Sequence, residues 1–207
     1  MPNITEIVAP PSGSGYWLLD FNGKIYDYGP ATAHYGDTYY MPKNEQACDM
    51  AVTPSGEGYW IVFEDGGIFT FGDAGFYGSA AHMPKNEQAC GMAATPSGEG
   101  YWIVFEDGGI FTFGDAGFYG STGNLKGWVV RDMAATPSGH GYWLVDETNA
   151  IGRFGNAPNL GPYGSGNFSD PKMSIAATPS GAGFWTVSLR GFVRAYGDAD
   201  WHGHPFE

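Results

Sequence analysis

The sequence predicts an all-β protein, and three observations support this prediction. The 207 residues include 34 Gly and 14 Pro, which form turns, together with 7 Trp, 13 Tyr and 14 Phe, which favour strands. This aromatic content excludes a disordered chain, because disordered chains lack the apolar surface that offsets the entropy lost on ordering. The third observation is an internal repeat of about 42 residues. We therefore expect short strands joined by tight turns.

Five copies of the repeat account for nearly the whole chain. Residues 53–79 recur unchanged at 95–121, and the preceding MPKNEQAC occurs at both 41–48 and 83–90. Three diverged copies contain the PSG turns that begin at Pro11, Pro137 and Pro179. Successive PSG turns are 41 to 43 residues apart. The sequence thus predicts one domain, residues 1–207, whose repeats are approximately 5–47, 48–89, 90–130, 131–172 and 173–207.

Each repeat begins with two predicted strands. The first is a short stretch of small and aliphatic residues, such as Met50-Ala51-Val52. A PSGxG turn follows, in which Pro presets φ and Gly supplies a positive φ. The second strand carries consecutive apolar residues, such as Tyr59-Trp60-Ile61-Val62. Because neighbouring strand residues point to opposite faces, this run predicts burial on both faces, and we interpret the repeated Trp as core.

A hairpin turn and a third strand complete the predicted repeat. We expect two-residue turns whose second residue, Gly or Asn, takes the left-handed conformation. They lie at Asn22-Gly23, Asp65-Gly66, Asp107-Gly108, Thr148-Asn149 and Arg190-Gly191. The third strand carries pairs such as Ile68 and Phe71, and residues 72–78 then predict a short outer strand or an edge turn.

These features predict a five-bladed β-propeller. Three or four strands in about 42 residues, buried on both faces, match one propeller blade. A linear β-solenoid is the alternative, although the chain has no distinct capping repeats. Five equal repeats, by contrast, can close on themselves and leave no exposed ends.

The string GYWIVFEDGGIFTFGDAGFYGS resembles a tandem repeat of secreted and surface proteins of actinobacteria, GYWLVxxDGGIFxFGDAxFYGS. The resemblance covers nearly the whole chain and implies a blade architecture and an extracellular or cell-surface setting. In architecture alone, five blades also resemble the tachylectin type of sugar-binding propeller. The fourth and fifth repeats depart from the pattern, with Gly152-Arg153 and Arg194-Ala195 in the third strand.

The net charge of the chain limits the classes of partner that the protein is expected to bind. The net charge of −13 disfavours nucleic acid and anionic lipid, because the chain would repel phosphate groups. No apolar run of about 18 residues is present, so we predict no membrane insertion. No motif predicts a cofactor. We expect a non-catalytic recognition module that binds carbohydrate of a cell wall or surface glycan, or another cell-surface partner. The alternative is a structural or protein-interaction scaffold, for example a surface-layer or virion component.

Two sets of residues are candidate ligand-binding groups. Asp73 and Asp115 follow the third strand, and Tyr77 and Tyr119 lie near the predicted outer edge. A carboxylate could accept hydroxyl hydrogen bonds while a tyrosine stacks on a sugar ring; the alternative roles are capping of the turn by the aspartate and packing by the tyrosine. The second set comprises amide and carboxylate side chains of the linkers: Asn44, Glu45, Gln46, Asn86, Glu87 and Gln88.

Two other groups of residues predict alternative functions, catalysis and metal binding. Glu6, Asp49 and Asp132 precede the first predicted strands and could converge at one mouth of a propeller channel, where five-bladed glycosidases hold their acid and base. The other interpretation is a rim of solvated charge. His202 and His204 could share one face of a strand and bind a metal, or they could be a solvated chain end. Cys48 and Cys90 occupy equivalent positions and could pair or stay free.

Overall fold

The computed structural model describes residues 2–30, 32–43, 45–160, 173–188 and 190–203. The chain divides into two compact units. Residues 1–103 and 111–116 form the first unit, and residues 104–110 and 117–207 form the second. Within the described ranges, no helix is long and apolar enough to cross a membrane.

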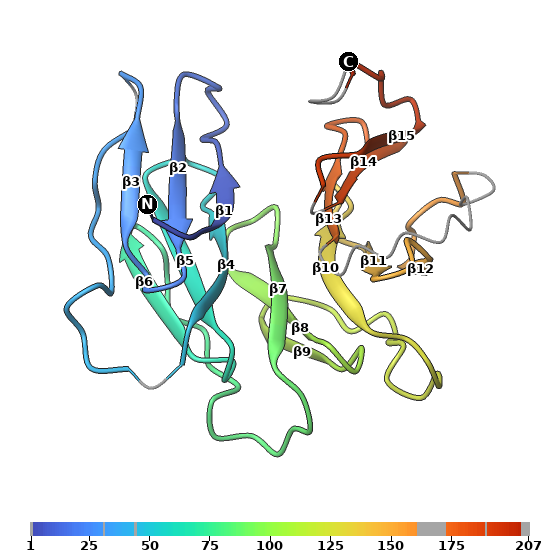
Figure 1. The fold of residues 1–207 in the computed structure, drawn as a ribbon, viewed down its shortest axis with the longest axis horizontal. Helices are drawn as coiled ribbons and strands as arrows, with labels where there is room; N and C mark the ends of the chain where they lie inside the picture. Colours follow the sequence, from blue (N-terminus) through green and yellow to red (C-terminus); the bar gives the residue numbers. More distant parts are fainter. Residues whose placement is uncertain (1, 31, 44, 161–172, 189, 204–207) are drawn as a thin grey trace. The chain divides into compact units, whose positions relative to one another are not determined.

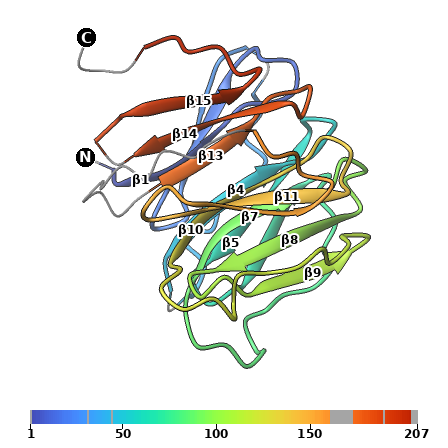
Figure 2. The same cartoon turned by 90° about the vertical axis from the view of Figure 1, so that its right-hand side faces the viewer.

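In the part of the chain that the structure describes, the protein is all-β, with five three-stranded antiparallel sheets in which the strands lie in chain order. Figure 1 shows the strands β1 to β6 of the first two sheets, and Figure 2 shows the fifth sheet, with β13, β14 and β15 side by side. Sheet 1 contains β1 (Ile4–Val8), β2 (Tyr16–Asp20) and β3 (Ile25–Tyr28). Sheet 2 contains β4 (Ala47–Val52), β5 (Gly58–Phe63) and β6 (Ile68–Gly72). Sheet 3 contains β7 (Ala89–Ala94), β8 (Gly100–Phe105) and β9 (Ile110–Gly114). Sheet 4 contains β10 (Val130–Ala135), β11 (Gly141–Asp146) and β12 (Ile151–Gly155). Sheet 5 contains β13 (Met173–Ala177), β14 (Gly183–Ser188) and β15 (Val193–Gly197).

The middle strand of each sheet forms most of the core. All six residues of β5, β8 and β11 are buried, which confirms the two-faced burial predicted from their consecutive apolar residues. The predicted core role of Trp is confirmed as well: Trp17, Trp60, Trp102 and Trp143 are fully buried, and Trp185 is partly buried.

The hairpins between the second and third strands differ from the prediction in length. In sheet 2 the Gly66 N–H donates to the Phe63 carbonyl and the Phe63 N–H donates to the Gly67 carbonyl, at 2.7 and 2.9 Å. This pattern leaves a three-residue loop instead of the expected two-residue turn, and the same pattern recurs in all five sheets. The predicted left-handed residue is confirmed, because Gly66 has φ of 76° and Asn149 has φ of 65°.

The first strands of sheets 1, 2 and 4 each contain a bulge. Between Ala47 and Asp49 the register with β5 shifts, so Cys48 is the extra residue on β4. Equivalent shifts lie between Ile4 and Glu6 and between Val130 and Asp132. A bulge turns the following side chain out of the regular alternation. The carboxylates Glu6, Asp49 and Asp132 all directly follow these bulges.

The segment after each third strand forms no strand within the described residues. It is held instead by the buried indoles. The Trp60 indole N–H donates to the Gly75 carbonyl at 2.7 Å, and Trp17, Trp143 and Trp185 make the equivalent bonds to Ala33, Pro158 and Asp200. Of the two predictions for this segment, the edge turn is therefore the one that the structure supports.

Candidate functional site

Asp73 is exposed at the end of β6, and its carboxylate binds the PSG turn of its own sheet. The Thr53 hydroxyl donates to Oδ1 at 2.9 Å, and the Ser55 hydroxyl donates to Oδ2 at 2.6 Å. These bonds join β6 to the turn that precedes β5. The carboxylate thus performs the turn role that was one of the two sequence interpretations, while its exposed oxygens keep lone pairs for another donor.

The same arrangement recurs in sheets 3 and 5. The Ser97 hydroxyl donates to Asp115 at 2.6 Å, and in sheet 5 the Ser180 and Thr178 hydroxyls donate to Asp198. The bonds from Ser180 and Thr178 lower the pKa of Asp198, because they stabilise its charged form. In sheet 4 the position is occupied by Asn156, whose amide donates to the Ser138 hydroxyl at 2.7 Å. Sheet 4 therefore has no carboxylate at this place.

Tyr77 joins sheet 2 to sheet 3 and is half-buried. Its hydroxyl donates to the Gly98 carbonyl, in the PSG turn of sheet 3, at 3.0 Å. Its backbone N–H donates to the Tyr101 hydroxyl at 3.2 Å, and that hydroxyl donates to the Gly78 carbonyl at 2.6 Å. Burial raises the pKa of Tyr101. The Tyr77 and Tyr101 rings also pack edge to face, with centroids 5.9 Å apart.

Gly78 explains why the motif places a glycine after the tyrosine. It has φ of 140°, and an added Cβ would lie 2.4 Å from Cδ1 of Phe113. Only glycine allows the chain to approach the sheet 3 aromatic ring this closely. We call the group formed by residues 76–78, residues 97–99, Tyr101 and Asp115 the second junction.

Tyr119 repeats these contacts in the second compact unit. Its hydroxyl donates to the Gly139 carbonyl at 3.0 Å, and its N–H donates to the Tyr142 hydroxyl at 3.2 Å. Gly120 has φ of 130° and packs on Phe154 in the same way as Gly78 packs on Phe113. We call the group formed by residues 118–120, residues 138–140, Tyr142 and Asn156 the third junction. In both junctions the tyrosine has the packing role that the sequence left open.

The residue before each junction tyrosine is a phenylalanine that faces solvent. Phe76 and Phe118 are each 62% exposed, although both belong to segments anchored by the contacts above. Sequence analysis missed these residues. The signal was present in the alternation of an extended chain: if Tyr77 packs inward, its neighbour Phe76 points the other way.

The two junctions differ in charge. At the second junction the exposed Glu99 directly follows Gly98, and the Asp115 N–H donates to the Glu99 carbonyl at 3.1 Å. At the third junction the equivalent residues are the exposed His140 and Asn156, again joined through the backbone at 2.9 Å. The turn that accepts the junction tyrosine therefore carries two exposed carboxylates, Glu99 and Asp115, in one case and an imidazole and an amide in the other.

The linker residues lie on the surface. Glu45, Gln46, Asn86, Glu87 and Gln88 are all exposed, and Asn44 lies outside the described residues. The loop is organised by lysine: the Lys43 ammonium donates to the Thr38 and Tyr39 carbonyls, and Lys85 donates to the Ala80 and Ala81 carbonyls. The linker side chains are thus accessible, but no described contact brings them to a junction.

The carboxylates proposed for catalysis bind backbone amides. Asp49 accepts hydrogen bonds from the Met50 and Met92 N–H groups, both at 2.6 Å. Asp132 accepts from the Met133 and Ile175 N–H groups and from the Ser174 hydroxyl. Glu6 accepts from the Ile7 N–H at 2.9 Å. Asp49 and Asp132 therefore link the first strands of successive sheets, which is a structural use of these groups.

Cysteine and histidine add no further site within the described part of the chain. Cys48 and Cys90 are free thiols, and burial raises the pKa of Cys48 well above its usual value. His202 is exposed, and His204 lies outside the described residues. Among the residues that the structure describes, no three His, Cys, Asp or Glu side chains are grouped to hold a metal ion.

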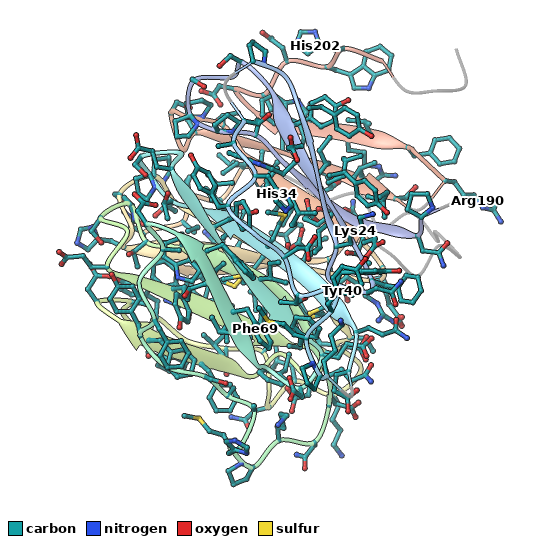
Figure 3. The ribbon with its side chains drawn as sticks, turned by 90° about the vertical axis from the view of Figure 1, so that its left-hand side faces the viewer. Lys24, His34, Tyr40, Phe69, Arg190 and His202 are labelled. Atoms are coloured by element: carbon teal, nitrogen blue, oxygen red, sulfur yellow. The ribbon has the colours of Figure 1, made fainter. Side chains whose placement is uncertain are left out.

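Sheet 1 carries a second group of exposed aromatic rings, which sequence analysis also missed. Tyr16 and Tyr28 stack with centroids 5.2 Å apart and are 40% and 48% exposed. At the other end of the sheet, the Lys24 ammonium lies over the Tyr26 and Tyr39 rings, and Tyr40 is 91% exposed (Figure 3). These rings occur once in the described chain and lack the repeated setting of Phe76 and Phe118.

Comparison with known proteins supports the fold alone. No family model matches the chain, and no curated protein matches its sequence. Among solved structures, the chain resembles the β-propeller domain of Cps50 (Swd1) from Myceliophteria thermophila, with a TM-score of 0.63 and 9% sequence identity. The match covers 99% of this chain and 70% of that domain. A likeness at this identity identifies a β-propeller architecture and carries no information about a ligand.

Proposed function

We propose that the protein is a non-catalytic, extracellular recognition module that binds carbohydrate of a cell wall or cell surface. In this proposal the five sheets are the blades of one five-bladed β-propeller. The extracellular setting is supported by the resemblance of the GYWIVFEDGGIFTFGDAGFYGS repeat to secreted and surface proteins of actinobacteria. The ligand class is supported by the exposed aromatic side chains at the junctions.

The observation that carries the proposal is the repeated exposure of Phe76 and Phe118. Each ring is 62% exposed on a segment held by tyrosine hydrogen bonds, so the ring is presented to solvent on an ordered support. Rigid aromatic surfaces next to a few polar groups are the usual components of a small-molecule site. A pyranose ring offers a matching surface, with an apolar C–H face and a rim of hydroxyl groups.

Two equivalent sites on one chain can together supply an affinity that a single exposed site lacks. A single exposed ring beside one or two hydrogen-bonding groups binds weakly, because exposed contacts compete with water. Two or more equivalent sites on one folded chain raise the avidity for a repeating polymer by orders of magnitude without new contacts. Polysaccharides are such polymers, which favours them over a single free sugar as ligand.

A glycan array probed with the full chain tests the proposal. The matched variants are the double substitution Phe76→Ala/Phe118→Ala and the control Tyr40→Ala, which removes an exposed ring outside both junctions. We expect the wild type and the control to bind the same glycans, and the double variant to bind at least about tenfold more weakly. If no glycan binds and a protein partner binds instead, the scaffold function replaces this one.

A further inference from the structure

Sheets 1 and 5 each leave one apolar face exposed, and we propose that these two faces bind one another between two copies of the chain. The exposed face of sheet 1 belongs to the first compact unit, and that of sheet 5 belongs to the second. In this proposal sheet 1 of one copy packs against sheet 5 of the next copy. The inference concerns self-association, so it goes beyond the proposed carbohydrate-binding function and does not depend on it.

Contacts between successive sheets show what covers such faces elsewhere in the molecule. Neighbouring residues of a strand point to opposite faces, so Tyr59 and Trp60 of β5 contact different sheets. The Tyr59 ring packs on Trp17 of sheet 1, and the Trp60 ring packs on Tyr101 of sheet 3, with centroids 5.6 and 5.8 Å apart. The second unit repeats this contact between sheets 4 and 5, at 5.5 Å. Each interface thus joins the tryptophan face of one sheet to the tyrosine or phenylalanine face of the following sheet.

The tyrosine face of sheet 1 is exposed. Tyr16 and Tyr28 are both exposed, whereas Tyr59, which occupies the place of Tyr16 in sheet 2, is fully buried. Ile7 of β1 is 58% exposed, whereas its equivalents in the other four sheets are at most 6% exposed. Ile7 pairs with Leu18, which lies two residues after Tyr16 and therefore on the same face. We call Ile7, Tyr16 and Tyr28 the sheet 1 face.

The tryptophan face of sheet 5 is exposed as well. Val187 of β14 is 38% exposed, whereas the equivalent valines of β5, β8 and β11 are fully buried. Trp185 lies on the same face and is partly buried, and its cross-strand neighbour Ala176 is exposed. We call Ala176, Trp185 and Val187 the sheet 5 face. It is the counterpart of the Trp17 and Trp60 faces that cover sheets 2 and 3.

The two faces also carry matching halves of a junction. At the second junction the Tyr101 hydroxyl donates to the carbonyl of Gly78, which has a positive φ. Gly203 occupies the place of Gly78 after sheet 5 and has φ of 100°, and Tyr16 occupies the place of Tyr101 in sheet 1. Tyr16 can therefore donate to Gly203 of the next copy. Because both faces are exposed in one structure, the missing half of each interface is assigned to a second copy.

Sedimentation velocity of the full chain over a range of concentrations tests the inference. Each copy carries one face of each kind, so the contact is heterologous, and blocking either face prevents self-association. We expect the wild type to self-associate, and we expect Ile7→Glu and Val187→Glu each to weaken the association at least about tenfold. Leu125→Glu is the matched control, because it places the same charge on an exposed apolar residue outside both faces.

A mixture of the two variants identifies the pair of faces. Ile7→Glu retains the sheet 5 face and Val187→Glu retains the sheet 1 face, so an equimolar mixture should form a heterodimer that neither variant forms alone. Misfolded variants could not restore association in this way. Self-association of the wild type without a heterodimer in the mixture would overturn the inference by placing the contact elsewhere. A wild type that is monomeric at every concentration would also overturn it, favouring closure of one five-bladed ring, and would leave the glycan-array result unaffected.

Discussion

Asp49 in the first compact unit and Asp132 in the second occupy equivalent places and link equivalent strands, but their surroundings differ. Asp49 binds the Met92 N–H of β7, where the neighbouring Gly91 has no side chain to offer. Asp132 binds the Ile175 N–H of β13 and, in addition, the Ser174 hydroxyl. The comparison shows that carboxylates which suggest catalysis in a sequence can serve to join neighbouring sheets. It also shows that this link tolerates variation in its partners.

Removal of the Asp49 carboxylate should have the largest effect. Asp49→Ala leaves the buried N–H groups of Met50 and Met92 without this acceptor, and each unpaired buried donor costs about 1–3 kcal/mol. We expect the free energy of unfolding to fall by about 2–4 kcal/mol in urea denaturation. A variant as stable as the wild type would show that Asp49 does not hold β4 to β7. The surface substitution Glu87→Ala serves as a control with no expected change.

The free energy of unfolding should depend on pH through the titration of Asp132. Burial raises the pKa of Asp132 from 3.8 to about 6, against the opposing effect of its three hydrogen bonds. Between these two values the folded state binds a proton that the unfolded state has lost, so stability falls as pH rises through this range. The loss between pH 4 and pH 7 is on the order of 2–3 kcal/mol.

The Asp132→Asn variant isolates this contribution, because it cannot titrate. Other carboxylates titrate in the same range, and Asp198, with its lowered pKa, acts in the opposite direction. The quantity to compare is therefore the change in unfolding free energy from pH 4 to pH 7 in the two proteins. We expect the wild type to lose more stability than Asp132→Asn over this interval. Equal changes would rule out a raised pKa for Asp132.

Loss of the extra hydroxyl should have the smallest effect. Ser174→Ala removes the donor to Oδ2 of Asp132 but leaves the Ile175 and Met133 N–H groups in place. We expect a loss of about 1 kcal/mol in thermal or urea unfolding, together with a higher pKa for Asp132. An effect as large as that of Asp49→Ala would mean that the hydroxyl, and not the backbone, is the main partner of Asp132.

Local sequence rules predicted most of the fold. The strands were located from the repeat period, the turn residues and the consecutive apolar residues of strands such as β5. Each of these patterns usually arises from one kind of local structure. The hairpin length was wrong because an Asp65-Gly66 pair fits both a two-residue turn and a three-residue loop with a left-handed glycine. Burial of Trp60 was predicted because both of its strand neighbours are apolar.

The candidate site was harder to predict, because the types of side chain that proteins use to bind sugars also build turns and pack sheets. Asp73 and Tyr77 were selected by residue type, and their partners, Ser55 and Gly98, became known only from the structure. Phe76 resembled a core residue in sequence. Its exposure follows from the inward orientation of the adjacent Tyr77, which depends on a neighbouring sheet.

In the proposed function the exposed phenylalanines, and not the carboxylates after the strand bulges, contact the ligand. Chemical-shift mapping by NMR, with the oligosaccharide that binds best on the array, distinguishes these two sets of residues. We predict that the largest shift changes occur at Phe76, Phe118 and the adjacent residues 97–99 and 138–140. Changes centred on Asp49 and Asp132, or on the Tyr16–Tyr28 pair, with none at the junctions, would show that the ligand binds elsewhere.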